Sequence, residues 1–138
     1  MILIDTNIFL EVLLQQDRYK ECELLLERVR AGELKAAVSR FSIYSIELIM
    51  ARYGRLKELK TFLTLLSTFR GLIVISTTLT DDLHALEVME RFNLDFDDAL
   101  HYYLVKKYRL DGIVSFDRHF DKTDIKRLEP KDLLKASG

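Results

Sequence analysis

The 138-residue chain contains little cysteine, proline or glycine, and it has no tryptophan. Cys22 is its only cysteine, which excludes an intramolecular disulfide and suits a reducing compartment. One proline and five glycines are spread along the chain as ends of elements, so no Gly/Pro-rich linker, repeat or low-complexity tract divides it. We therefore expect one domain over residues 1–138.

Long hydrophobic runs and an excess of one charge are also missing. No apolar run approaches the roughly 20 residues that span a bilayer, and no basic segment precedes a short apolar one as in a signal peptide. A cytoplasmic protein is therefore expected. The 21 Lys and Arg against 22 Asp and Glu give a formal net charge of −1. This balance excludes a protein held to nucleic acid by bulk positive charge, so any such contact must be a local patch.

Short apolar runs alternate with helical patterns along the chain. We predict strands over residues 1–4, 34–38, 72–75, 112–115 and 125–128. We predict helices over residues 8–14, 18–32, 39–53, 56–71, 80–92 and 97–108. Strands that alternate with helices are typical of a parallel sheet that helices cover on both faces, so the predicted fold class is α/β.

Four acidic residues stand out in this pattern. Asp5 directly follows the first strand, and Asp117 lies two residues past the strand over 112–115. In open parallel sheets, ligands bind beyond the carboxyl ends of the strands. Glu47 lies on an otherwise apolar helix, and Asp98 opens another largely apolar one. We therefore consider these four acids as one candidate site.

Each of these acids also has a purely structural interpretation. Asp5 and Asp117 could cap the helical segments that follow them, Asp97 could be an N-cap, and Asp98 could be a first-turn acid that the helix dipole favours. Glu47 resists such an explanation, because no basic side chain lies three or four residues away from it.

Electrostatic repulsion decides what a converged cluster requires. Two carboxylates about 5 Å apart repel by about 3 kcal/mol at an effective dielectric constant near 20. Four of them would strain a fold whose total stability is only ~5–15 kcal/mol. Either some stay protonated or a divalent cation lies among them. Oxygen ligands favour Mg²⁺ or Mn²⁺ over zinc, and such ions suit phosphoryl chemistry by activated water. The three histidines are scattered, and we interpret His101 as a packed helix residue.

The order of these motifs resembles the PIN domain. The resemblance rests on Asp5-Thr6-Asn7 after the first strand, Glu47 on the third helix, Asp98 in Asp-Ala-Leu-His, and Asp117 in Val-Ser-Phe-Asp-Arg-His-Phe. It covers residues 1 to about 133. It implies a three-layer α/β/α fold with a short parallel sheet. The small single-domain members that the chain resembles are the VapC toxins of toxin–antitoxin pairs.

The resemblance implies a Mg²⁺- or Mn²⁺-dependent endoribonuclease that cuts RNA. Carried over position by position, the acids that bind the metal would be Asp5, Glu47, Asp98 and Asp117. The polar residues that orient a carboxylate or a phosphate would be Thr6, Asn7 and Ser115. The family's helix normally offers the acid immediately before the alanine, which selects Asp98 over Asp97. Whether Asp97 or Asp121 joins the cluster is left open. Family members commonly form homodimers, and the toxins bind a small antitoxin.

Binding of RNA requires positive charge near the acids. Residues 101–138 carry nine basic and six acidic side chains, and Arg118 beside Asp117 is the candidate to meet a phosphate. Four tyrosines on predicted helices could stack on bases, although helical tyrosines are more often core or interface: Tyr44, Tyr53, Tyr102 and Tyr103. The apolar stripe along residues 56–69 is either core or the face for a dimer or an antitoxin.

Two other functions remain open at this point. A phosphatase of the haloacid dehalogenase type also uses Mg²⁺ and an aspartate at a strand end, but it needs a second aspartate where this chain has Asn7. A non-catalytic module that binds RNA or a partner protein would keep the acids without turnover.

Overall fold

The computed structural model describes residues 1–135, and residues 136–138, the end of the predicted domain, lie outside the described part. The strands are β1 (Ile2–Ile4), β2 (Ala36–Ser39), β3 (Leu72–Ile75), β4 (Ile113–Val114) and β5 (Arg127–Leu128). The helices are α1 (Thr6–Leu13), α2 (Tyr19–Arg30), α3 (Arg40–Arg52), α4 (Leu56–Leu66), α5 (Leu79–Phe92), α6 (Phe96–Lys107) and α7 (Pro130–Lys135), with a 3-10 helix η1 (Arg118–Lys122) before β5.

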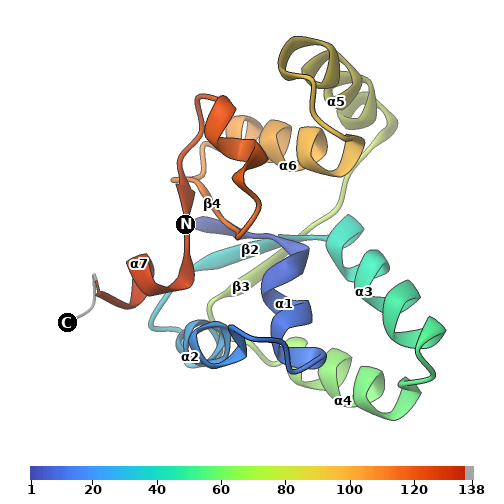
Figure 1. Ribbon diagram of the computed structural model, residues 1–138, viewed down its shortest axis with the longest axis vertical. Coiled ribbons are helices and arrows are strands. Elements are labelled where there is room, and N and C mark those ends of the chain that lie inside the picture. The colour runs from blue at the N-terminus through green and yellow to red at the C-terminus, as the bar shows by residue number, and fades with distance from the viewer. Residues whose placement is uncertain (136–138) are drawn as a thin grey trace.

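The five strands form one all-parallel sheet in the order β3-β2-β1-β4-β5. In the register, Leu3 lies between Ala37 and Ile113. Because every strand runs the same way, the carboxyl ends of β1, β2 and β4 lie at one edge, as Figure 1 shows for the central strands.

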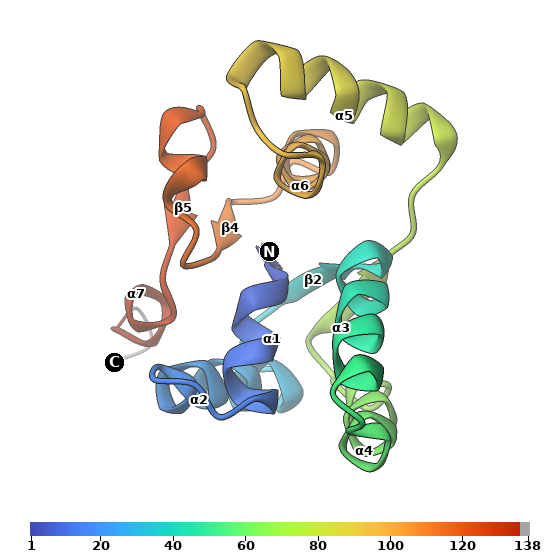
Figure 2. The same cartoon turned by 45° about the vertical axis from the view of Figure 1, so that its right-hand side comes forward.

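Helices cover both faces of the sheet, which confirms the predicted three-layer α/β/α fold. Successive strand residues point to opposite faces: Ile2 and Ile4 pack with α1, α2 and α3, whereas Leu3 packs with α5 and α6. Figures 1 and 2 show α5 and α6 on one side and α1, α2, α4 and α7 on the other. Buried on both faces, the inner strands are apolar except for Ser39 at the end of β2.

Most element boundaries differ from the predicted ones by one to three residues, and two differences have clear causes. Helix α4 ends at Leu66 instead of continuing toward Gly71, because the hydroxyls of Ser67 and Thr68 donate to carbonyls of the last turn. The sequence pattern does not predict helix α7, because a six-residue helix is too short to show a periodic pattern. Within residues 1–135, no helix is both long and apolar enough to cross a membrane.

Candidate functional site

The site begins where β1 and β4 end side by side. The Asp5 N–H donates to the Val114 carbonyl at 3.1 Å, so that Asp5 and Ser115 follow neighbouring strand ends. The strands that precede Asp5 and Asp117 are therefore neighbours in the sheet. Both side chains therefore leave the sheet at the edge where ligands bind in parallel α/β folds.

The Asp5 carboxylate is buried, and hydrogen-bond donors surround it. Its Oδ1 accepts from the Thr6 N–H at 2.8 Å, which makes Asp5 the N-cap of α1. Its Oδ2 accepts from the Ser115 hydroxyl at 2.6 Å and from the Asn7 amide at 3.4 Å. The structural interpretation of Asp5 as a cap is correct, and its charge also acts on Asp98 in the cluster described below. The surrounding donors fix the orientation of the Asp5 carboxylate.

Ser115 connects the two carboxylates that follow β1 and β4. Its hydroxyl oxygen accepts from the Asp117 N–H at 2.9 Å and from the Asn7 amide at 3.2 Å, while its proton goes to Asp5. Because Ser115 is fully buried, its hydroxyl orients Asp5 and the backbone of Asp117 and cannot itself reach a phosphate. The side-chain amide of Asn7 donates to both Asp5 and Ser115 and so holds these two side chains together.

Asp98 comes to this edge from the other layer, on the first turn of α6. Its carboxylate is buried, and Oδ2 lies 3.4 Å from Nδ1 of His119. The same Nδ1 lies 3.0 Å from Oδ1 of Asp117. Ligand atoms of Asp98, Asp117 and His119 all lie within 4.8 Å of one another. Asp117 also caps η1 by accepting from the His119 N–H at 2.9 Å.

The electrostatics of the cluster are visible in Asp98. Burial, followed by the negative charges of Asp97, Asp117 and Asp5, raises its pKa from 3.8 to about 7. The hydrogen bond from His119 acts in the opposite direction. An acid whose ionised form is disfavoured by burial and by three neighbouring carboxylates lacks countercharge, and the hydrogen bond from His119 offsets only part of this. The residues present therefore fit a bound divalent cation, which would supply the rest.

Behind Asp5 lies a second polar group that the sequence did not predict. His101 is fully buried on α6, and its Nε2 lies 2.8 Å from the Ser39 hydroxyl and 3.1 Å from the Ser42 hydroxyl. The Thr6 hydroxyl donates to Ser42 at 2.8 Å. The other ring nitrogen, Nδ1, lies 3.8 Å from Oδ1 of Asp5 and has no hydrogen-bond partner among the described residues. His101 is a packed helix residue, as expected, but it packs against the site.

Glu47 differs from the other three predicted acids. It is half-buried on α3 and lies 3.6 Å from Nη1 of Arg40, whose guanidinium stacks on Tyr44. It thus has the basic partner that the sequence seemed to lack, because Arg40 lies seven residues earlier, about two helical turns away. The close cluster of ligand atoms includes neither Glu47 nor Asp5. A role for Glu47 in binding metal stays a prediction.

The structure also places the acids that the sequence left open. Asp97 is exposed, and the N-cap of α6 is Asp95, so the interpretation of Asp97 as an N-cap was wrong. Asp121 is exposed and paired with Arg127 at 2.9 Å. Asp98, by contrast, is buried in the cluster.

The basic residues near the carboxyl terminus are mostly engaged. Lys106 pairs with Asp124 and Lys107 with Asp81, each at 2.7 Å. Arg118 is exposed beside Asp117 and has no ion-pair partner within residues 1–135. Of the tyrosines considered for stacking, Tyr102 is buried and cannot accept a base. Arg118 is therefore the best-placed cation at this edge of the sheet.

Comparisons with known proteins bear on the family and the fold of the chain. The PIN domain family model matches residues 2–126. The VapC20 toxin of Mycobacterium tuberculosis, described as cleaving the Sarcin-Ricin loop, superposes with a TM-score of 0.74 at 15% identity over 91% of this chain and 97% of that one. A toxin–antitoxin complex from Klebsiella pneumoniae gives 0.68 at 21% identity, over 94% and 98%. VapBC2 from Rickettsia felis, bound to a promoter DNA fragment, gives 0.64 at 16%, over 94% and 98%. No curated protein matches the sequence.

Proposed function

Because the chain belongs to the PIN domain family, we propose that it is a divalent-metal-dependent endoribonuclease and the toxin of a toxin–antitoxin pair. The observation that carries this proposal is the cluster of Asp98, Asp117 and His119 at the carboxyl edge of the sheet. Burial, followed by the negative charges of Asp97, Asp117 and Asp5, raises the pKa of Asp98 there to about 7. The VapC structures, with sequences less than 25% identical to this chain, support the fold in which such a site would work.

In this proposal, Asp5, Asp98 and Asp117 hold the cation, and Glu47 joins them from α3. The site's oxygen ligands suit Mg²⁺ or Mn²⁺, and the imidazole of His119 is acceptable to Mn²⁺. A cation bound there would supply Lewis acidity toward a phosphate oxygen and make water more acidic.

The remaining polar residues have supporting roles in the proposal. Ser115, Asn7 and the Thr6 N–H hold the Asp5 carboxylate in one orientation, which a preorganised site requires. Arg118 is exposed beside Asp117 and would attract the RNA backbone as a positional contact without reading sequence. The balanced net charge of −1 makes this local contact necessary.

RNA cleavage by variants of the purified protein tests the proposal. With Mn²⁺ or Mg²⁺ we expect cleavage of RNA that EDTA abolishes, and we expect Asp5→Asn and Asp98→Asn to abolish it with the circular dichroism unchanged. Asp97→Asn is the matched control, because Asp97 precedes Asp98 but is exposed. Undiminished cleavage by Asp5→Asn would refute the assignment. Binding of RNA without cleavage would identify a non-catalytic module instead.

The phosphatase alternative is not favoured. The family match is to the PIN domain, and Asn7 stands where the phosphatase would need a second aspartate. The Asn7 amide instead donates to Asp5 and Ser115. Turnover of small phosphate esters through a phosphoenzyme would be evidence for that alternative.

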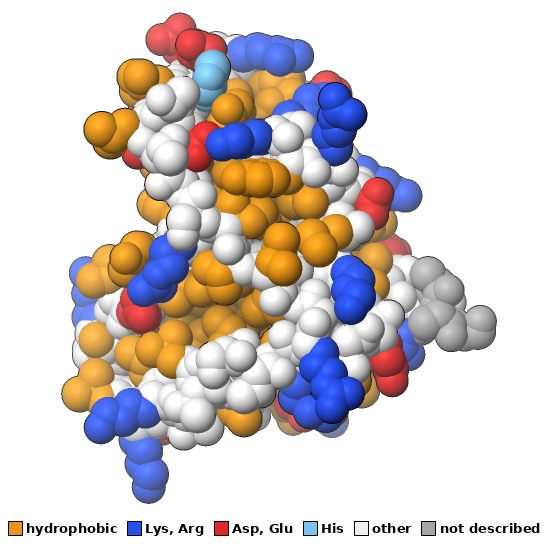
Figure 3. All heavy atoms as spheres, turned by 180° about the vertical axis from the view of Figure 1, so that it is seen from behind, with side chains coloured by type: hydrophobic (Ala, Val, Ile, Leu, Met, Phe, Trp, Pro, Cys, Tyr) orange, Lys and Arg blue, Asp and Glu red, His pale blue; other side chains and the backbone are white. Residues whose placement is uncertain are grey.

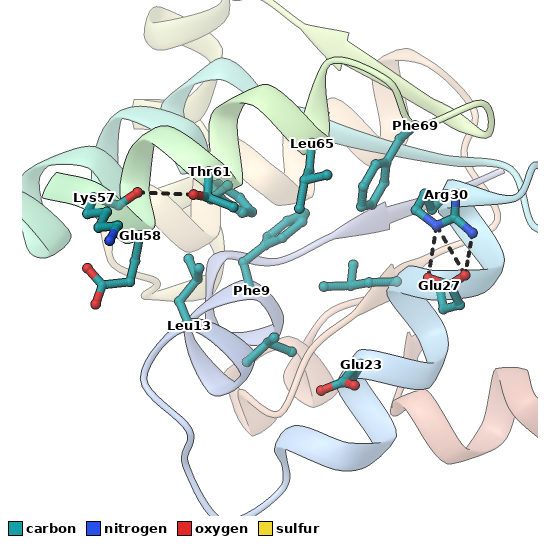
Figure 4. A pocket seen from close by; sticks show the side chains of 13 residues that line it. Phe9, Leu13, Glu23, Glu27, Arg30, Lys57, Glu58, Thr61, Leu65 and Phe69 are labelled. Atoms are coloured by element: carbon teal, nitrogen blue, oxygen red, sulfur yellow. Dashed lines mark hydrogen bonds and ion pairs between the residues drawn. The ribbon is translucent and has the colours of Figure 1, made fainter. Parts of the chain in front are cut away.

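An apolar groove supports an antitoxin as partner. It lies between α1, α2 and α4 and has a volume of about 630 Å³ (Figure 4). Its apolar lining consists of Phe9, Val12, Leu13, Leu26, Phe62, Leu65 and Phe69. The predicted apolar stripe therefore divides: Leu66 is core, whereas Phe62 and Phe69 pack on the core and also line the groove. A groove of this kind accepts the apolar face of an amphipathic helix.

Introducing a charge in the groove tests the antitoxin proposal. Leu65 lines the groove and is 51% exposed, so Leu65→Asp should prevent binding of a co-expressed antitoxin without unfolding the protein. Leu48→Asp is the control, because Leu48 is also exposed but lies on α3, outside the groove lining. Equal antitoxin binding by both variants would contradict the placement.

A homodimer is the second assembly that we propose. Leu79, Leu83 and Leu86 are exposed at helical spacing on α5, and hydrophobic side chains also gather in the middle of the face that Figure 3 shows. Exposed stripes of this kind mark protein interfaces. Light scattering should give a dimer, and Leu83→Lys should give a monomer that still binds Mn²⁺.

The cytoplasmic location also remains a prediction.

A further inference from the structure

The buried imidazole of His101 is the most unusual polar group in the described part of the chain. It is enclosed completely, yet its Nδ1 has no hydrogen-bond partner among the described residues. Buried polar atoms without partners are rare and costly, so each needs an explanation. The polar atom that Nδ1 faces is Oδ1 of Asp5, at 3.8 Å. This distance is beyond a hydrogen bond but within strong electrostatic reach inside a protein.

The two sides of the ring make different demands on its proton. On the Nε2 side are the hydroxyls of Ser39 and Ser42, at 2.8 and 3.1 Å, and hydroxyls can donate or accept. On the Nδ1 side is a carboxylate, which when ionised can only accept. A lone pair on Nδ1 would face that anion and repel it, whereas an N–H would attract it. The carboxylate thus selects the neutral tautomer with the proton on Nδ1.

The neighbouring hydroxyls accommodate this tautomer. Ser39 Oγ accepts from the Ser42 N–H at 3.0 Å, and its own proton can go to Nε2 of His101 at 2.8 Å. Ser42 Oγ accepts from Thr6 Oγ1 and also lies 3.1 Å from Nε2. Burial lowers the pKa of His101, which keeps the ring neutral.

His101 also joins the elements that carry the candidate acids. It lies three residues after Asp98 on α6, so the two side chains share a helix face. Through Ser39 and Ser42 it contacts the first turn of α3, and through Thr6 and Asp5 the start of α1. One imidazole therefore fixes three elements relative to one another at the site. Polar residues behind a metal-binding carboxylate orient it and tune its affinity.

We propose that His101 is a positioning residue for Asp5, a neutral imidazole whose Nδ1–H is aimed at Oδ1 and holds the carboxylate in its metal-binding orientation. The inference rests on the proposed function, since it assigns a purpose to the orientation of Asp5. His101 touches neither substrate nor metal in this arrangement. Its effect on the reaction passes through Asp5 alone.

The tautomer is tested first, on the unmodified metal-free protein. Long-range ¹H–¹⁵N spectra at pH 7.5 distinguish protonated from unprotonated ring nitrogens. We expect a protonated Nδ1 and an unprotonated Nε2 for His101. A proton on Nε2, or on both nitrogens, would overturn the inference whatever the variants do, so the test does not depend on whether a substituted protein folds.

Two amide variants then test the positioning itself. In His101→Asn the amide nitrogen takes the place of Nδ1, whereas in His101→Gln it takes the place of Nε2. We expect His101→Gln to weaken Mn²⁺ binding and to lower kcat by about 10- to 100-fold with KM unchanged, and His101→Asn to restore most of both. If both variants lose Mn²⁺ affinity and kcat to the same extent, in proportion to the fall in their melting temperatures, His101 has a merely structural role and the inference is overturned.

Calorimetric titration with Mn²⁺ separates this inference from the proposed function. If the unmodified protein cuts RNA and both variants bind Mn²⁺ as tightly as it does, the inference fails and the function stands. If the unmodified protein binds Mn²⁺ without cutting RNA, the function fails, and the affinities of the two variants still decide the inference. Absence of Mn²⁺ binding by the unmodified protein would refute both.

Discussion

Replacement of Asp98 by asparagine should change how the stability of the metal-free protein depends on pH. The Asp98 carboxylate is buried beside three other acids, and its pKa rises from 3.8 to about 7 in the folded protein. Between these two values the folded state holds a proton that the unfolded state has released, so the free energy of unfolding falls as pH rises. Above about pH 7 both states are ionised and the loss is complete.

The size of the effect follows from the shift. A pKa change of about three units corresponds to at most about 4 kcal/mol of destabilisation at pH 7.5 relative to pH 4. The amide that replaces the carboxyl group does not titrate, so the Asp98→Asn variant should equal the wild-type protein at pH 4 and exceed it in stability by up to that amount at pH 7.5. Asp97→Asn replaces the exposed neighbouring acid, so it should change the pH dependence of the unfolding free energy much less.

Urea unfolding in EDTA at a series of pH values measures the difference directly. Groups far from the cluster titrate equally in both proteins, so subtracting the two stability curves isolates Asp98 together with the acids whose charges act on it. Parallel curves between pH 4 and pH 8 would refute the reasoning, as would a wild-type protein that gains stability over the variant as pH rises. Either result would mean that the cluster is not short of positive charge.

Three further predictions concern the scaffold. Lys107→Ala should lower the free energy of unfolding by about 1–3 kcal/mol, measured in urea, because it leaves the buried Asp81 carboxylate without its ion pair; an unchanged value would contradict the pairing. Gly71→Ala should lower the free energy of unfolding by more than about 1 kcal/mol, because the added Cβ would lie 2.2 Å from the Leu34 carbonyl oxygen. A melting temperature equal to that of the wild-type protein would contradict this close approach. Burial raises the pKa of Cys22 to about 12, so iodoacetamide at pH 8 should label it only after unfolding; rapid labelling of the native protein would show an accessible thiolate.

Much of the site could be predicted because its parts follow strand ends. Asp5 and Asp117 are each placed by a strand whose apolar pattern is plain in the sequence, and parallel strands bring their carboxyl ends to one edge. Asp98 was identified through its motif, and its burial on α6 agrees with the choice over Asp97. In these cases local pattern and overall topology point to the same place.

What the sequence did not reveal depends on contacts between distant residues. His101 meets Ser39 across 62 positions of the chain, so its role has no local signal. His119 lies within the motif that carries Asp117, but its approach to Asp98 depends on how η1 packs against α6. The pair between Arg40 and Glu47 spans two helical turns, farther than neighbouring side chains on a helix are expected to interact.

Anomalous diffraction from a crystal soaked in Mn²⁺ tests the central claim most directly. We expect a manganese peak between the carboxylates of Asp5, Asp98 and Asp117, and its disappearance from crystals of Asp98→Asn treated in the same way. A map without density among these side chains at millimolar Mn²⁺, or an ion bound elsewhere while this edge of the sheet stays empty, would contradict it.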